Sequence, residues 1–214
     1  MRRLCVCLIP VLCCAATLAQ NPTPDSAPAA PGSAAEIGLS YQLPAGWTVV
    51  VPQPQPKPVS PALPLLPPKG TACIRVPQTA RHGDPASVIV VVALPFDCYG
   101  QAMTGDDLAG FGSGAADGLK QTFDLTGPVQ GSYSLDGHPF WIQRARGNPK
   151  GHSDLQYTVE IACGLLKKGA VCWMAMAADD ASLHAFEQMP VALDGDAATP
   201  LVPGSAFDKA ASAP

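Results

Sequence analysis

Residues 155–177 read LQYTVEIACGLLKKGAVCWMAMA and predict the β-hairpin around which the fold is arranged. Two runs of apolar and β-branched residues flank a Lys-Lys-Gly turn at 167–169. If the turn has two or four residues, opposing positions sum to 335, and Cys163 faces Cys172 in a non-hydrogen-bonded pair. Cα atoms in such pairs lie about 4.5 Å apart, which a disulfide tolerates. A three-residue turn with a bulge would instead put the two thiols on opposite faces.

The other two cysteines of the chain body, Cys73 and Cys98, would then form a second bridge. Four cysteines allow three pairings, and spacing alone does not choose among them. The body has no C-x-x-C motif, which argues against a redox or metal role and favours structural disulfides.

The first nineteen residues have the pattern of a secretory signal peptide. Arg2 and Arg3 precede an apolar run from Leu4 to Ala16, and a small-residue site ends at Ala19. We expect cleavage after Ala19 and a secreted or periplasmic chain, where disulfides persist. The run is shorter than the roughly 20 apolar residues of a membrane-spanning helix. A lipidated cysteine is a minor alternative, because neither Cys13 nor Cys14 follows a small residue.

The charge of the chain excludes some partners. There are 13 Lys and Arg residues against 17 Asp and Glu residues, and loss of Arg2 and Arg3 makes the mature chain more acidic. An acidic chain is not attracted to nucleic acid or anionic lipid by its net field. The sequence contains no second long apolar run, so it predicts no membrane-spanning helix after the first nineteen residues.

Composition divides the chain into one domain and three irregular segments. Residues 20–36 are predicted to be a flexible Pro/Ala linker, and residues 194–214 a disordered tail. Between them, residues 37–193 form a single domain with a Pro-rich insertion at 52–68, where eight of seventeen residues are proline. Such a segment favours polyproline II, either as a ligand for an aromatic groove or as a stiff loop.

The remaining periodicity predicts an α+β fold with a mainly antiparallel sheet packed by helices. Residues 86–94 (ASVIVVVAL) indicate a strand in the middle of the sheet. Thr104 and Asp107 cap a helix whose glycines each weaken it by about 1 kcal/mol, unless they allow close approach to the sheet. Asp136-Gly137 predicts a tight hairpin turn, and a final helix begins at Asp179.

Candidates for chemistry are few. His138, His152 and Asp154 would suit a metal site, although Asp, Gly and Ser also gather at turns for backbone reasons. No G-x-S-x-G turn positions a nucleophile, and GFGSGAADG at 110–118 lacks the context of a phosphate loop. Trp141 is expected to pack under a helix, or else to mark a contact patch. We therefore assign no catalytic, cofactor-binding or metal-binding residue.

The order of these motifs resembles that of Mog1/PsbP/DcrB-like domains. The shared features are LSYQLPAGWTVV at 39–50, the strand, helix and DGHPF hairpin, and a closing D-x-S-x-x-x-F helix. The resemblance implies an antiparallel sheet between helices over about residues 37–193, in a family whose members are mostly not enzymes. The four body cysteines and the Pro-rich insertion depart from that pattern.

Together these features predict an exported, disulfide-stabilised, non-enzymatic domain for binding or for an accessory role in the cell envelope. Its partner would be a protein or a small molecule, and no cofactor is implied. Two alternatives remain open: an exported hydrolase or metal-dependent enzyme, and an interaction module that uses the Pro-rich segment.

Overall fold

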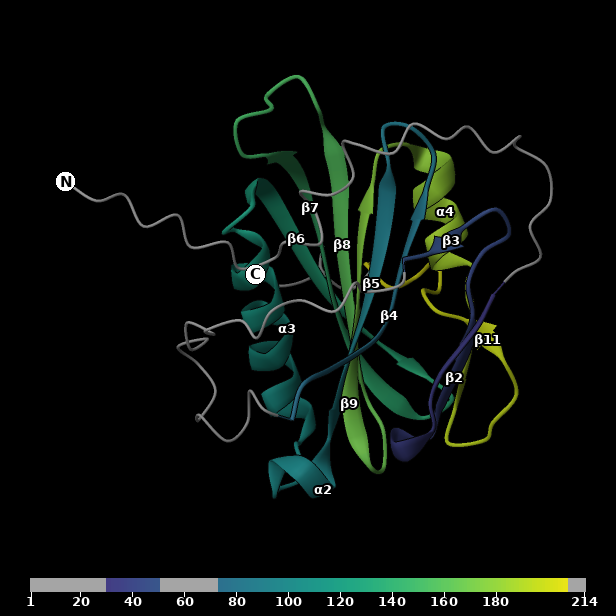
Figure 1. The fold of residues 1–214 in the computed structure, drawn as a ribbon. Helices are drawn as coiled ribbons and strands as arrows, with labels where there is room; N and C mark the ends of the chain where they lie inside the picture. The colour runs from purple at the N-terminus through teal and green to yellow at the C-terminus, as the bar shows by residue number, and fades with distance from the viewer. Residues whose placement is uncertain (1–29, 51–72, 208–214) are drawn as a thin grey trace, which may run out of the picture.

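The structure, a computed structural model, describes residues 30–50 and 73–207 (Figure 1). The expected signal peptide at 1–19 and the Pro-rich segment at 52–68 lie outside the described residues. The elements in chain order are β1 (Pro31–Ala34), the 3₁₀ turn η2 (Ala35–Ile37), β2 (Leu39–Gln42), β3 (Thr48–Val49), β4 (Arg75–His82), β5 (Ser87–Pro95), α2 (Phe96–Tyr99), α3 (Gly105–Leu119), β6 (Phe123–Leu135), β7 (His138–Pro149), β8 (Tyr157–Leu165), β9 (Gly169–Ala177), α4 (Asp180–Glu187), β10 (Pro190–Leu193) and β11 (Thr199–Pro200).

The strands form two antiparallel sheets. A seven-stranded sheet has the order β3-β4-β5-β9-β8-β7-β6, and a four-stranded sheet has the order β1-β2-β10-β11. Figure 1 shows α3 lying across one face of the large sheet, with β2, β11 and α4 on the other side. The predicted α+β class with a mainly antiparallel sheet is confirmed. The second outer layer combines α4 with the small sheet, rather than helices alone.

Two hydrophobic cores lie on the two faces of the large sheet. One packs Leu108, Ala116 and Leu119 of α3 against β7 and β8, together with both sulfurs of the β8–β9 hairpin. The other fills the space between the large sheet and the small sheet, around the fully buried Trp173 and Phe186. Each core is built from alternate residues of the same strands, because successive side chains of a strand point to opposite faces.

The central hairpin has the predicted register. Cys163 pairs with Cys172 and Leu165 with Ala170, and the Leu166 N–H donates to the Gly169 carbonyl, so the two-residue turn is Lys167-Lys168. β5 lies inside the sheet between β4 and β9, as predicted. Its residues Ile89 and Val91 are fully buried, whereas Val88 and Val90 on the α3 side are only partly buried. The reason is that α3 packs over β7 and β8 rather than over β5.

Two predicted boundaries differ from the structure. Part of the expected linker at 20–36 is ordered, because Pro31–Ala34 pairs with Leu39–Gln42 as β1 of the small sheet. Part of the expected tail at 194–214 is ordered as well, since Leu201 and Ala206 are completely buried. Composition predicted irregular structure in both places. A short edge strand or a covering segment can nevertheless be ordered with only a few buried residues, because its other contacts are backbone hydrogen bonds.

Within the described parts of the chain, no helix is long and apolar enough to cross a membrane.

Candidate functional site: an open cleft beside an edge strand

A cleft of about 570 Å³ lies between the N-terminal end of α3 and the β6–β7 hairpin. Leu108 and Trp141 contribute apolar surface, and their side chains are only 2% and 7% exposed. Ser132 and Ser134 of β6 form one rim, and Asp106 of α3 lies on the opposite rim. The cleft therefore combines apolar surface with hydroxyl and backbone groups and one acidic side chain.

A single glycine sets the closeness of α3 to this cleft. A Cβ atom on Gly112 would lie 2.2 Å and 2.3 Å from Cε3 and Cζ3 of Trp141. Carbon atoms normally make contact at about 3.5–4.0 Å, so only glycine fits here without movement. Gly110, Gly114 and Gly118 have open space around them. Trp141 therefore packs under the helix as predicted, and one of the four glycines provides the close approach.

The start of α3 is capped as the sequence predicts. The Asp107 carboxylate accepts hydrogen bonds from the backbone N–H and the Oγ1 hydroxyl of Thr104, both at 2.8 Å. These bonds favour the ionised form and lower the pKa of Asp107. Asp107 is thus occupied in capping, which leaves its neighbour Asp106 to face the cleft.

The turn of the first hairpin determines which backbone groups reach the cleft. Asp136 and Gly137 have φ angles of 50° and 82°, and Leu135 pairs directly with His138. After such a two-residue turn, hydrogen-bonded and non-hydrogen-bonded pairs alternate along the hairpin. Ser134, Ser132 and Gln130 fall in the non-hydrogen-bonded pairs, so their N–H and C=O groups point away from β7. Because β6 is the last strand of the sheet, these groups face outward.

A buried carboxylate lies on the opposite face of the large sheet. Glu160 of β8 is 0% exposed, and its Oε2 accepts a 2.6 Å hydrogen bond from Nε of Arg144. Arg144 also bonds to Glu187 of α4, and the ring of Phe207 packs 4.5 Å from its guanidinium carbon. Burial raises the pKa of Glu160 to about 7, although the Arg144 guanidinium acts in the other direction. This raised pKa belongs to a buried carboxyl in an ion-pair network on the face of the sheet opposite the cleft.

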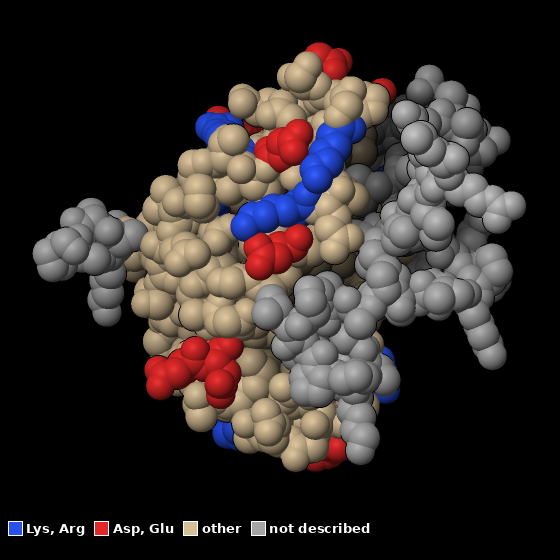
Figure 2. Space-filling view, turned by 90° about the vertical axis from the view of Figure 1, so that its left-hand side faces the viewer, with Lys and Arg blue, Asp and Glu red and all other residues tan. Residues whose placement is uncertain are grey.

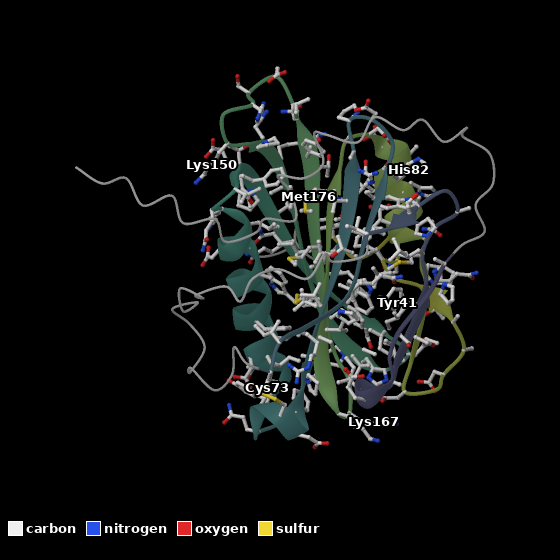
Figure 3. The ribbon with its side chains drawn as sticks, in the orientation of Figure 1. Tyr41, Cys73, His82, Lys150, Lys167 and Met176 are labelled. Carbon is white, nitrogen blue, oxygen red and sulfur yellow. A yellow bond between two sulfur atoms is a disulfide. The ribbon has the colours of Figure 1, made fainter. Side chains whose placement is uncertain are left out.

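The histidines considered for a metal site are far apart. His138 begins β7, whereas His152 and Asp154 follow its end; at about 3.3 Å per residue, this twelve-residue strand spans roughly 35 Å. Figure 3 shows the same separation through Lys150 and Lys167, which lie at opposite ends of the molecule. In the described residues there is no group of three or more His, Cys, Asp or Glu that could hold a metal ion.

His138 instead links three turns. Its Nδ1 lies 3.1 Å from the Leu165 carbonyl, and its Nε2 lies 3.6 Å from Asp194 and 3.9 Å from Asp196. The residue joins the β6–β7 turn to the end of β8 and to the loop after β10. Both ring nitrogens face oxygen atoms, which is the arrangement of a structural histidine.

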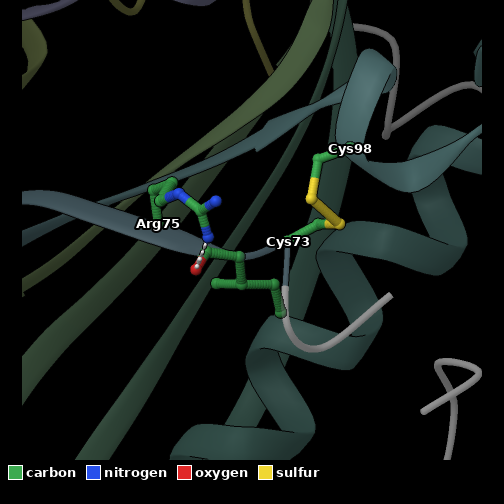
Figure 4. Close-up of a disulfide and its surroundings, with 4 residues drawn as sticks. Cys73, Arg75 and Cys98 are labelled. Atoms are coloured by element: carbon green, nitrogen blue, oxygen red, sulfur yellow. Dashed lines mark hydrogen bonds between the residues drawn. A yellow bond between two sulfur atoms is a disulfide. The ribbon is translucent and has the colours of Figure 1, made fainter. Parts of the chain in front are cut away.

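The structure contains two disulfides that use the four body cysteines. Cys163 and Cys172 are bonded with a Cα–Cα distance of 4.1 Å, inside the core beneath α3. Cys73 and Cys98 are bonded with a Cα–Cα distance of 5.5 Å, which ties the start of the β4 segment to α2 (Figure 4).

Sequence reasoning missed the cleft and the ion-pair network. The one charged residue in the apolar run YTVEIAC, Glu160, was a signal of a buried charge, because such residues are almost never fully buried without a partner. The uncharged run VQGSYSL at 129–135 was a signal of an unprotected edge.

No family model matches the chain, and no curated protein matches it. Among solved structures, the chain is similar to the solution structure of cyanobacterial PsbP (CyanoP) from Synechocystis sp. PCC 6803. The two are 15% identical, the match covers 86% of this chain and 89% of that chain, and the TM-score is 0.39.

Proposed function

We propose that the chain is an exported, disulfide-stabilised binding domain without catalytic activity, which uses the cleft between α3 and β6 as its recognition surface. The partner is a protein or a small molecule encountered outside the cytoplasm. An accessory role in the cell envelope would suit such a domain.

The observation that carries this proposal is the composition of the cleft. Leu108 and Trp141 provide an apolar surface, and polar groups at the rim can fix the orientation of a ligand, as in typical binding sites. Catalysis by acid–base or nucleophilic groups needs titratable side chains within reach of a substrate. The carboxyl group with the most suitable pKa, Glu160, is instead sealed on the other face of the sheet.

Export is supported by the signal-like N-terminus together with the two disulfides, which persist in oxidising compartments. Intact mass with thiol alkylation, before and after reduction, tests this part. Expression of the full-length gene should yield an exported chain that starts at Gln20, with no alkylation before reduction and four alkylations after it. A chain that retains residues 1–19 or has free thiols would contradict export with two bridges.

Site-specific photocrosslinking tests the recognition surface. A photoreactive amino acid at Ala109, which lines the cleft, should crosslink a partner in the source cells. The matched control is the same amino acid at Asp117, which is exposed near the other end of the same helix. Equal crosslinking from both positions would count against the cleft as the binding surface.

A further inference from the structure

The outer edge of β6 offers an open row of backbone hydrogen-bonding groups. The N–H and C=O groups of Gln130, Ser132 and Ser134 point outward, and among the described residues no backbone or side-chain partner is found for them. An unpaired edge is a template for a further strand. We propose that this edge binds an extended peptide segment of a partner protein, which adds as an eighth strand and inserts an apolar side chain into the cleft.

The two halves of β6 differ in how the edge is protected. The first half contains a bulge between Thr126 and Val129, with Pro128 inside it. Bulges and prolines are common devices that prevent strand addition. The second half, residues 129–135, contains neither proline nor a charged residue. Figure 2, which views the side of the molecule that lies at the left of Figure 1, shows that most of the visible described surface there lacks acidic and basic side chains. Strand addition is therefore favoured on the second half.

The side of the sheet on which the cleft lies determines what the peptide must carry. Ser132 pairs with Trp141, so its side chain projects toward α3. A peptide residue opposite Ser132 projects to the same side, because neighbours across a sheet share a face. Its side chain would enter the cleft above Leu108 and Trp141. A large apolar side chain suits this space.

Charge narrows the class of peptide further. Asp106 is the charged residue among those that line the cleft, and Asp136 lies in the adjoining turn. The residues that flank the apolar side chain should therefore be neutral or basic. A second copy of this chain is a poorer occupant, because its β6 would present only Gln130, Ser132 and Ser134 toward the cleft and would bring like charges together.

Proline substitution at the edge provides a direct test. The N–H of Ser132 faces outward, so Ser132→Pro removes it without breaking a hydrogen bond to β7, and prolines are tolerated on edge strands. Ser132→Ala retains the N–H and is the matched control. The probe is a series of fluorescent pentapeptides, Lys-Thr-X-Thr-Lys, with X varied from Leu and Phe to Ser and Asp. Binding to the oxidised exported chain is measured by fluorescence anisotropy.

We expect saturable binding when X is Leu or Phe, and an affinity at least roughly tenfold lower when X is Asp. Ser132→Pro should weaken binding of the Leu peptide by a similar factor, and Ser132→Ala, which loses the rim hydroxyl but keeps the N–H, should weaken it much less. A peptide N-methylated at X should bind as weakly, and this readout remains valid even if the proline variant fails to fold.

Four results would overturn the proposal. They are equal binding by the proline variant and the wild type, equal binding of the N-methylated peptide, no binding by any peptide, and a dimer in light scattering that Ser132→Pro converts to a monomer. The last result would assign the edge to self-association. The inference rests on the cleft being the recognition surface, but the two can fail separately. Photocrosslinking specific to Ala109 without peptide binding would refute strand addition alone.

Discussion

Gly112→Ala should destabilise the fold, although the same substitution at Gly114 should stabilise it. Both residues lie inside α3, where replacement of glycine by alanine gains about 1 kcal/mol of helix propensity. At Gly112 the new Cβ atom would lie 2.2 Å from a ring carbon of Trp141, more than 1 Å inside normal contact. Relief of such overlap in a packed core costs roughly 1–3 kcal/mol. At Gly114 nothing lies within 4 Å.

The gain in helix propensity is the same for Gly112→Ala and Gly114→Ala, so it cancels when the stabilities of the two variants are compared. Gly112→Ala should therefore be less stable than Gly114→Ala by roughly 1–3 kcal/mol. Urea unfolding of the oxidised chains, followed by circular dichroism, measures this difference. Gly110→Ala is a second control, because its surroundings are also open. If Gly112→Ala proved as stable as these controls, α3 would not be positioned by its contact with Trp141.

Three further predictions concern the interior and the disulfides. The pKa of Glu160 is about 7 in the folded chain rather than its ordinary 4.5, so between these pH values the folded chain retains a proton that the unfolded chain releases. The free energy of unfolding should therefore fall as pH rises from 4.5 to 7, by up to about 3 kcal/mol. Urea unfolding at several pH values should show this fall in the wild type and a flatter dependence in Glu160→Gln. Tyr133→Phe removes a 2.8 Å hydrogen bond to the Leu201 carbonyl, so it should cost about 1 kcal/mol and speed amide exchange in residues 199–207. Replacement of Cys73 and Cys98 by alanine should lower the free energy of unfolding by about 3.5 kcal/mol through chain entropy, and replacement of Cys163 and Cys172 by about 2.6, because the sequence separations are 25 and 9. A loss larger than about 2.6 kcal/mol for the second pair, measured by urea unfolding, would show that its packing in the core also contributes.

The features that local chemistry controls could be predicted from the sequence. The Asp136-Gly137 turn sets the register of one hairpin, and the pairing of Cys163 with Cys172 follows from the next turn. The cap of α3 at Thr104 has a similarly short range. In each case a few adjacent residues decide the geometry, so no knowledge of distant contacts was needed.

The cleft could not be predicted, because it depends on how α3 sits on the sheet. Five glycines lie in this helix, and no local signal distinguishes Gly112, which would contact Trp141 through a Cβ atom, from Gly114, which has nothing within 4 Å. The N–H and C=O groups of β6 that face outward lack a partner strand because β6 is the last strand of the sheet, and the strand order is not visible in the sequence. Residues 199–207 fall within the predicted tail at 194–214, because a sequence does not show which surface its few apolar side chains will cover.

Residues 199–207 hold the proposed binding edge of β6 in place, although the disulfides lie elsewhere in the domain. Both disulfides lie outside the β6–β7 hairpin, and they hold β8 to β9 and the start of the β4 segment to α2. The hairpin is held on its inner face by the C-terminal segment, through Tyr133 and Leu201 and through the contact of Arg144 with Phe207. The Ala206 carbonyl also lies directly over Gly131, where a Cβ atom would come within 2.3 Å of it. The covalent bonds thus stabilise the half of the sheet opposite the edge, whereas the edge depends on noncovalent contacts. A strand that adds to β6 should therefore slow amide exchange in residues 129–135 and 199–207, and leave β8 and β9 unchanged.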